Sequence, residues 1–92
     1  MTLPIRWTTR AKRRLEAVFR YIAAENPAAA LALQDRIESL VVSLAEHPYL
    51  YRPGRAPGTR ELVAHPNYIV IYSVRDAEVV ILNVVHARQQ YP

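Results

Sequence analysis

Apolar residues are densest in the last third of the chain, in two runs separated by a short charged segment. The runs cover residues 68–74 and 79–85, and residues 75–78 join them. Because β-branched and aromatic residues at this density suit a buried, pleated surface, the runs predict the two strands of a hairpin. Alternation divides the side chains of the first strand into two sets, one beginning with Tyr68 and the other with Ile69. The alternation alone does not indicate which set faces the rest of the protein.

The first half of the chain predicts a short strand and a helix. Apolar residues alternate with polar ones at residues 3–7, and Pro4 places this strand at a sheet edge, because proline has no N–H to donate to a neighbouring strand. Thr8 or Thr9 can cap the helix that follows. The apolar stripe of this helix, at helical spacing, consists of Ala11, Leu15, Val18, Phe19 and Ile22.

The pair Asn26-Pro27 marks the start of a second helix, since asparagine caps helices and proline suits a first helical position. We expect this helix to run from about Pro27 to Glu46, where His47-Pro48 ends it. The join between the helices is so short that they must fold back as an antiparallel hairpin. The buried side of the second helix is predicted to consist of Ala30, Leu33, Ile37, Leu40, Val41 and Leu44.

The remaining segment predicts a loop and one more strand. Residues 49–59 contain both glycines in Pro-Gly pairs that favour turns, and residues 60–64 form a short strand before the hairpin. The order is therefore β-α-α-β-β-β. We predict an α+β fold of two layers, with an antiparallel helical hairpin packed on a mainly antiparallel four-stranded sheet. Its length makes residues 1–92 a single domain.

Composition narrows the class of protein. The net charge is +4, and all the basic side chains except Lys12 are arginines, which suit bidentate contacts to phosphate or carboxylate. The absence of cysteine excludes disulfides and thiolate metal sites, and three scattered histidines offer no ligand spacing, so we expect no metal and no cofactor. Because no run approaches the roughly 20 apolar residues of a membrane span, we expect a soluble cytoplasmic protein without membrane contact.

The sheet face that the helices leave uncovered is the predicted place of function. Arg52, Arg55 and Arg60 lie in or beside the loop, and His86 and Arg88 lie at the end of the sheet. These five side chains can converge on an anion. Such a cluster would bind a phosphate or an acidic segment of a target.

Two interpretations of these residues stay open. Metal-free RNA cleavage needs a base, an acid and fixed cations, and His86, Tyr91 or Glu61 can transfer protons while Arg60 or Arg88 supplies the charge. The alternative is that His86 is a strand-end histidine bonded to backbone groups. These residue types are common on protein surfaces, so they do not decide between a nuclease and a binding protein.

Several segments together carry a resemblance to a known family. They are Trp7-Thr8, Tyr21-Ile22-Ala23, Asn26-Pro27-Ala28-Ala29, Arg52-Pro53-Gly54-Arg55, residues 58–63, residues 68–72 and residues 85–92. With the strand–helix–helix–three-strand order, the whole chain resembles the RelE/ParE superfamily of toxins from bacterial type II toxin–antitoxin modules. RelE- and YoeB-like members of this superfamily are ribosome-dependent mRNA endonucleases, and ParE-like members poison DNA gyrase.

The resemblance favours the ParE-like branch. Ribonuclease members place an arginine just before the apolar run of the middle strand, and the matching position here is Ile69. The His-Tyr or lone Tyr that they carry at the chain end would fall near Ala87 and Arg88. Arg52 and Arg55 only partly replace the lysine pairs of their loop. The step from His86 to Arg88 is instead similar to ParE-like members.

The resemblance therefore implies a ParE-like toxin that poisons DNA gyrase. The alternatives are a ribosome-dependent mRNA endonuclease, which would be an enzyme, and a non-toxic module that binds an antitoxin and regulates an operator. All three imply a hetero-oligomeric complex with an antitoxin, whose disordered, acidic-hydrophobic tail folds along the helical hairpin or adds a strand to the sheet. Predicted antitoxin contacts are Phe19, Leu33, Ile37 and Tyr72, and predicted target or anion contacts are Arg52, Arg55, Arg60 and Arg88.

Overall fold

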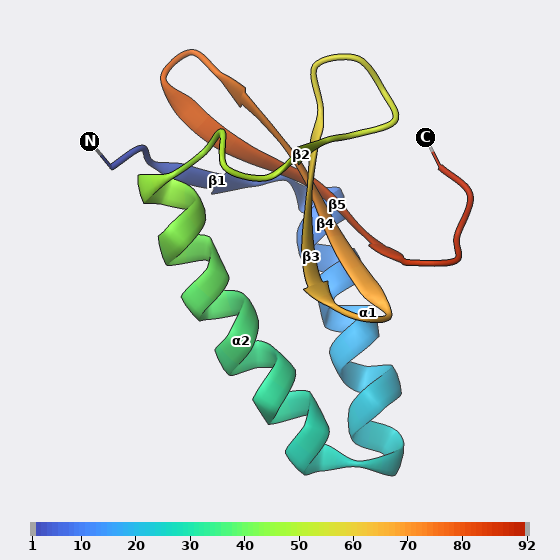
Figure 1. The fold of residues 1–92 in the computed structure, drawn as a ribbon. Coiled ribbons are helices and arrows are strands. Elements are labelled where there is room, and N and C mark those ends of the chain that lie inside the picture. The colour runs from blue at the N-terminus through green and yellow to red at the C-terminus, as the bar shows by residue number, and fades with distance from the viewer. Residues whose placement is uncertain (1, 92) are drawn as a thin grey trace.

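Two helices and five strands follow the predicted order, with one strand added. The computed structural model describes residues 2–91; Met1 and Pro92, which the single-domain prediction includes, lie outside the described residues. The elements are β1 (Ile5–Trp7), α1 (Thr9–Glu25), α2 (Pro27–Glu46), β2 (Arg52–Pro53), β3 (Arg60–His65), β4 (Tyr68–Arg75) and β5 (Glu78–His86) (Figure 1). The α+β fold of two layers is confirmed. The sheet has five strands rather than four because the two residues of β2 pair with Arg60 and Glu61.

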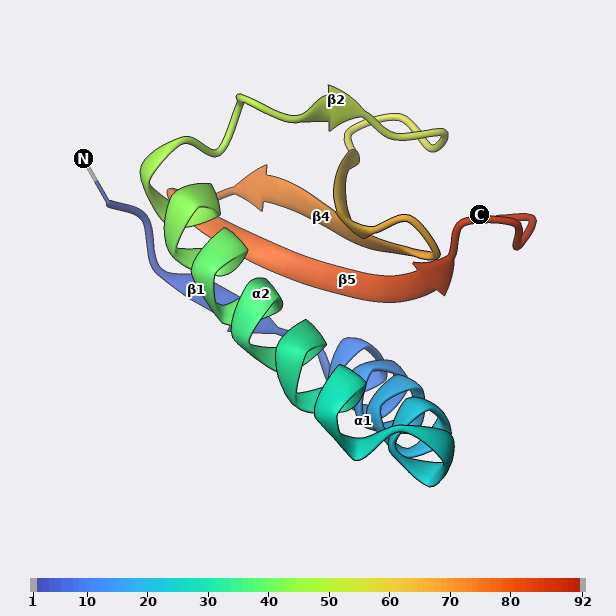
Figure 2. The same ribbon diagram turned by 60° about the horizontal axis from the view of Figure 1, so that its bottom comes forward.

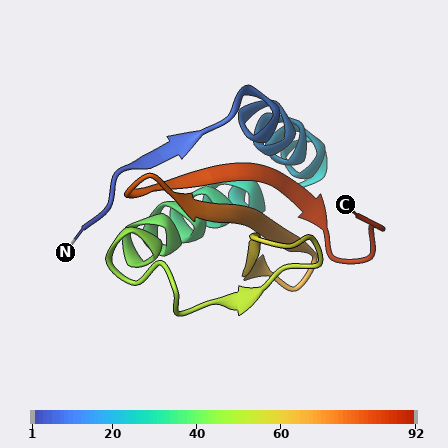
Figure 3. The same cartoon turned by 90° about the horizontal axis from the view of Figure 1, so that it is seen from above.

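The sheet has the strand order β1-β5-β4-β3-β2. In Figure 3, β1 lies beside β5 and β2 lies at the opposite side of the sheet. β1 runs parallel to β5, whereas the other neighbours are antiparallel. The predicted edge position of the first strand is confirmed, although Pro4 precedes the strand and its carbonyl accepts the N–H of Val79 at 2.9 Å. The first strand of the chain therefore lies beside the last one, at one edge of the sheet.

Capping side chains fix both helix starts at the predicted places. The Oγ1 atom of Thr8 accepts the N–H of Ala11 at 3.1 Å, and the Oδ1 atom of Asn26 accepts the N–H of Ala29 at 3.0 Å. With Asn26 alone between them, α1 and α2 form the predicted antiparallel hairpin, which lies against one face of the sheet (Figure 2). Within residues 2–91, neither helix is long and apolar enough to cross a membrane.

The β4–β5 hairpin is also confirmed, and its turn has two residues. Arg75 pairs with Glu78, and Asp76 and Ala77 between them have φ values of 53° and 58°. Two successive positive φ angles are typical of the type I′ turn, which matches the twist of a hairpin. A register shift between Ile71 and Tyr72 inserts one extra residue in β5. That shift reverses which residues of β5 point to each side.

The structure shows which side of the sheet the helices cover. Tyr68, Val70 and Tyr72 pack with helix residues in the main core, so this side is called the helix face. The other side, called the open face, carries Ile69 and Ile71 in a smaller cluster. The buried members of the main core are Ala11, Leu33, Ile37, Leu44, Leu62, Ala64, Tyr68, Val70, Tyr72, Val79, Ile81 and Val84.

Candidate functional site

A partly buried ion pair lies on the open face. Arg52 and Glu61 are register partners in β2 and β3, and Glu61 in turn lies opposite Ile71. The Nε atom of Arg52 donates to Oε1 of Glu61 at 2.7 Å. The side chain of Glu61 is 6% exposed and that of Arg52 is 58% exposed. The carboxylate is therefore enclosed, while much of the guanidinium remains available to a ligand.

The chain end covers part of the open face. After β5 the chain turns, and the N–H of Ala87 donates to the carbonyl of Asn67 at 2.8 Å. Tyr91 then packs against the small cluster of Ile69, Ile71 and Val85. The guanidinium carbon of Arg55 lies 4.3 Å from the centroid of the Tyr91 ring, a cation–π contact. The hydroxyl of Tyr91 is buried and has no hydrogen-bond partner within the described protein.

A pocket of about 260 Å³ adjoins this tyrosine on the open face. Its lining includes the apolar Ile71 and Leu82 together with Arg10 and the two glutamines of the chain end. A further cation of this face, Arg75, donates through Nε to Oγ of Ser73 at 2.9 Å. The lining consists of Arg10, Ala56, Thr59, Ile71, Leu82, Asn83, Gln89, Gln90 and Tyr91. The open face thus combines apolar contact area with donors that suit an anionic or carbonyl-rich surface.

Arg60 lies on the helix face, away from Arg52. It pairs with Tyr72, and its Nη1 atom donates to the carbonyl of Tyr51 at 2.8 Å. Its guanidinium carbon lies 5.0 Å from the centroid of the Tyr49 ring. The hydroxyl of Tyr72 donates to the carbonyl of Pro48 at 2.6 Å. Arg60 and Tyr72 therefore hold the loop between α2 and β2, and Arg60 takes no part in an open-face site.

The buried position of Tyr72 changes the pKa of its hydroxyl. Burial raises the pKa of this hydroxyl to about 12, because the charged phenolate would lose its hydration. The positive charge of Arg60 opposes that shift, and Tyr51 adds to it. The hydroxyl therefore keeps its proton further into the alkaline range than an exposed tyrosine and serves as a hydrogen-bond donor.

His86 also belongs to the helix face. It pairs with Tyr68, and the two rings meet edge to face with centroids 5.5 Å apart. The N–H of Arg88 donates to Nδ1 of His86 at 3.1 Å, as expected for a strand-end histidine bonded to the backbone. In the neutral ring the proton is therefore on Nε2. The side chain of Arg88 is exposed.

The structure thus does not bring the five predicted anion contacts together. Arg52 and Arg55 lie over the open face, whereas Arg60 and His86 lie on the helix face. Adjacent residues of a strand point to opposite sides, so Arg60 could not join Arg52 when Glu61 is the partner of Arg52. The sequence analysis did not predict that Tyr91 packs on the open face. A chain end has no hydrophobic periodicity from which its packing could be predicted.

The predicted antitoxin contacts are mostly core residues. Leu33, Ile37 and Tyr72 are buried, and Tyr72 is 0% exposed, so it offers no surface to a partner. Phe19 is half-buried and shares with Ile37 an apolar pocket of about 250 Å³ between the helices and β1, lined by Trp7, Leu15, Phe19, Gln34, Ile37, Glu38 and Val41. The apolar stripe of a helix identifies the side that faces the core. A large exposed side chain, Tyr21, is the better signal for a partner.

Fold and site define a small α+β protein with a helical hairpin on one sheet face and a cationic, partly covered opposite face. The sequence matches the family described as ParE toxin of type II toxin-antitoxin system, parDE, over residues 5–91, and the chain belongs to this family. Among residues 2–91, no group of three or more histidines and carboxylates could hold a metal ion.

Two curated proteins are similar over nearly the whole chain. "Putative toxin Y4kP" of Sinorhizobium fredii is 50% identical over 90 residues, which are 96% of this chain and 92% of that protein. "Toxin RelE2" of Caulobacter vibrioides is 40% identical over 81 residues, which are 88% of this chain and 91% of that protein.

Solved structures share the fold. A chain of the chromosomal ParDE system from P. aeruginosa superimposes with a TM-score of 0.80 at 24% identity, covering 92% of this chain and 96% of that one. A chain of the RelBE2 toxin–antitoxin complex from Mycobacterium tuberculosis gives a TM-score of 0.64 at 26% identity, covering 94% and 99%. Both ParE- and RelE-named systems therefore contain this arrangement of helices and strands.

Proposed function

We propose that this toxin inhibits growth by binding and poisoning DNA gyrase, without cutting RNA itself. One observation carries the proposal: the groups that a nuclease needs do not meet at one place on the sheet. Arg60 and His86 share the helix face, but they pair with β4 residues that are four positions apart, Tyr72 and Tyr68. The hydroxyl of Tyr91 is buried on the open face. Acid, base and cation must all lie within hydrogen-bond reach of one phosphate.

The position of Ile69 adds to this proposal. An arginine precedes the apolar run of the middle strand in ribonuclease members that the chain resembles, and here the aliphatic Ile69 occupies that place. It is buried in the small cluster beneath Tyr91. An aliphatic side chain cannot stabilise the charge that develops on a phosphate during cleavage.

The open face is the surface we assign to gyrase. Arg52 is held in place by Glu61, and Arg55 is held in place by the Tyr91 ring. Fixed guanidinium groups lose little side-chain entropy on binding, so they suit an acidic protein surface or DNA held by the enzyme. Such a toxin acts in a fixed ratio to its target rather than by turnover.

A gyrase assay tests the proposal. Toxin freed from its antitoxin should make gyrase accumulate cleaved plasmid, and Arg55→Ala should weaken this effect. Arg20→Ala is the matched control, because Arg20 is an exposed arginine on α1 that forms only a surface pair with Glu16. Normal supercoiling with no cleaved product at excess toxin would contradict gyrase as the target.

A ribosome-dependent mRNA endonuclease is the second candidate. The 40% identity to a protein named "Toxin RelE2" and the arginines of the open face favour it. Primer extension on translated messages in expressing cells would then show cuts at fixed codon positions. Induction distinguishes the two: gyrase poisoning triggers the DNA-damage response, whereas mRNA cleavage stops translation first.

We also propose a cognate antitoxin that neutralises the toxin in the cytoplasm, in a hetero-oligomeric complex. Structural neighbours named ParDE, RelBE2 and DinJ-YafQ are toxin–antitoxin systems, which supports this partnership. A toxin that has lost its lethality and only binds an antitoxin is the remaining alternative. Absence of any growth defect on induction would favour that alternative.

A further inference from the structure

Two neighbouring pockets lie where the helical hairpin meets the end of the sheet. The first, of about 380 Å³, is lined by Tyr21, Ile22, Ala29, Ala32, Leu33, Arg36, His65, Asn67 and Tyr68. The second, of about 250 Å³, is lined by Arg14, Ala17, Val18, Tyr21, Tyr68, Val84, His86 and Gln89. Tyr21 and Tyr68 line both pockets, so they stand between the two hollows.

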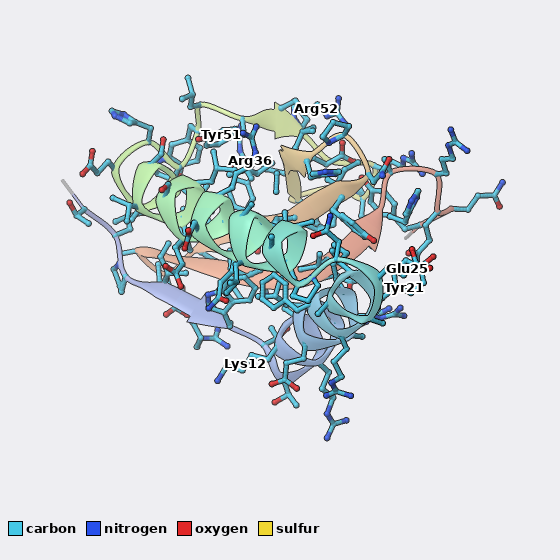
Figure 4. All side chains as sticks on the ribbon, turned by 90° about the horizontal axis from the view of Figure 1, so that it is seen from below. Lys12, Tyr21, Glu25, Arg36, Tyr51 and Arg52 are labelled. Atoms are coloured by element: carbon cyan, nitrogen blue, oxygen red, sulfur yellow. The ribbon has the colours of Figure 1, made fainter. Side chains whose placement is uncertain are left out.

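Each pocket has an apolar part that would accept an apolar side chain. Ala32 and Leu33 contribute to the first, and Val18 and Val84 contribute to the second. Tyr21 is 76% exposed, the largest exposed fraction among the big apolar side chains of the described residues. Figure 4 shows it near the end of α1, with Arg36 on α2. Exposed tyrosines beside apolar hollows are typical anchors of protein interfaces.

A row of three rings crosses the sheet between the pockets. His65, Tyr68 and His86 are register partners on β3, β4 and β5, with successive ring centroids 5.8 Å and 5.5 Å apart. Nδ1 of His65 accepts the N–H of Asn67 at 3.0 Å, and Nδ1 of His86 accepts the N–H of Arg88 at 3.1 Å. Each neutral ring therefore carries its proton on Nε2 and offers it as a donor.

The charges of these pockets have one sign. Arg36 lines the first pocket while its Nε atom bonds to the carbonyl of Ala64, and Arg14 lines the second. No aspartate or glutamate is among the residues that line either pocket. Donors and cations around apolar hollows complement a segment that carries both carboxylates and apolar side chains. A nucleic-acid backbone would leave the hollows empty.

We propose that the two pockets bind one segment of the antitoxin, with an apolar side chain in each pocket and a carboxylate over Tyr68 between the histidines. This inference rests on the proposed antitoxin partnership and adds the place and the chemistry of the contact. The carboxylate accepts a hydrogen bond from the Nε2–H of one of the two imidazoles, and Arg14 and Arg36 provide the surrounding positive potential.

Calorimetric titration of the toxin with the antitoxin encoded beside it tests the inference. Ala32→Glu places a negative charge in the first pocket and should weaken binding by about tenfold or more. Ala28→Glu, in the exposed first turn of the same helix, is the matched control and should bind as the wild type does. Thermal unfolding of both variants shows whether each is folded.

A second pair of variants isolates the positive charge. Arg14→Gln should weaken binding by about two- to fivefold and reduce its dependence on salt. Arg13→Gln removes the same charge from the neighbouring exposed position, which does not line a pocket, and should have no comparable effect. Likewise, His65→Gln and His86→Gln should weaken binding more than His47→Gln does.

The outcomes are distinguishable. If the wild type does not bind the antitoxin, both the partnership and the inference fail. If the wild type binds but Ala32→Glu and Arg14→Gln bind equally well, the partnership stands and the pocket assignment is wrong. Charge reversal gives the decisive check, because Arg14→Glu should be rescued by exchanging one antitoxin carboxylate for lysine. Displacement of the antitoxin by a single-stranded RNA oligonucleotide would assign the pockets to nucleic acid and overturn the inference.

Discussion

Each face of the sheet buries a tyrosine, but only one of the two hydroxyls has a hydrogen-bond partner in the described protein. On the helix face, the hydroxyl of Tyr72 donates to the carbonyl of Pro48 at 2.6 Å. On the open face, the hydroxyl of Tyr91 is buried without a partner in the described protein. Buried polar groups are normally hydrogen-bonded, so an unpaired buried hydroxyl is an exception. The helix face therefore satisfies its buried tyrosine hydroxyl within the chain, whereas the open face leaves one buried hydroxyl unpaired in the described protein.

The largest expected loss in the free energy of unfolding comes from the main core under the helix face. Leu44 is fully buried under the helix face, so Leu44→Ala should lower the free energy of unfolding by about 2–5 kcal/mol. Val42→Ala, at an exposed position on the same helix, should change it by less than about 0.5 kcal/mol. Urea denaturation followed by circular dichroism measures both. Equal losses would show that the helix does not pack as described.

The next effect concerns the ion pair of the open face. Arg52→Gln leaves the enclosed carboxylate of Glu61 without its cation and should cost about 1–3 kcal/mol. Arg6→Gln breaks a more exposed pair with Glu78 and should cost no more than about 1 kcal/mol. Denaturation at low and high salt compares the two variants. A larger loss from Arg6→Gln would contradict the enclosure of Glu61.

The hydroxyl of Tyr72 predicts a dependence on pH. Its pKa is raised from 10.0 to about 12 in the folded protein, so the folded state holds this proton more tightly than the unfolded state. The stability from this group is fully present below pH 10 and is lost as the pH rises through 12. Tyr72→Phe should cost about 1 kcal/mol at neutral pH and should flatten the decline above pH 10. An identical alkaline decline in both proteins would disprove the assignment.

The smallest expected change in the free energy of unfolding is a gain rather than a loss. Tyr91→Phe removes a buried hydroxyl that has no partner, so the variant should be as stable as the wild type or slightly more stable, by up to about 1 kcal/mol. Because the buried hydroxyl is not accessible to a target, the toxicity of the variant should equal that of the wild type. Growth curves after induction, beside the unfolding data, separate the two effects. Destabilisation like that of Tyr72→Phe would mean that the hydroxyl is bonded in solution.

The sequence predicted the local elements well because their signals are local. Asn26 and Pro27 set the start of α2, and the predicted end at Glu46 is also observed. Two dense apolar runs predicted the hairpin of β4 and β5. In these cases a cap, a turn or a period within a few residues decides the structure.

The arrangement of the candidate site depended on contacts that no local pattern encodes. Alternation separated the side chains of Tyr68 and Ile69 but could not show which of them faces the helices. The two-residue strand β2 is defined by its pairing with Arg60 and Glu61 across a loop. The packing of Tyr91 on the open face joins the chain end to a strand some twenty residues earlier. Predicted convergence of the arginines failed for the same reason.

The parallel pairing of β1 with β5 has a consequence for the order in which the protein is made. Translation releases β1 long before β5, so the first strand waits for its partner until residues 78–86 have been synthesised. The complete five-stranded sheet cannot form before that moment. A nascent chain that ends before Glu78 therefore leaves β1 without its neighbour in the sheet.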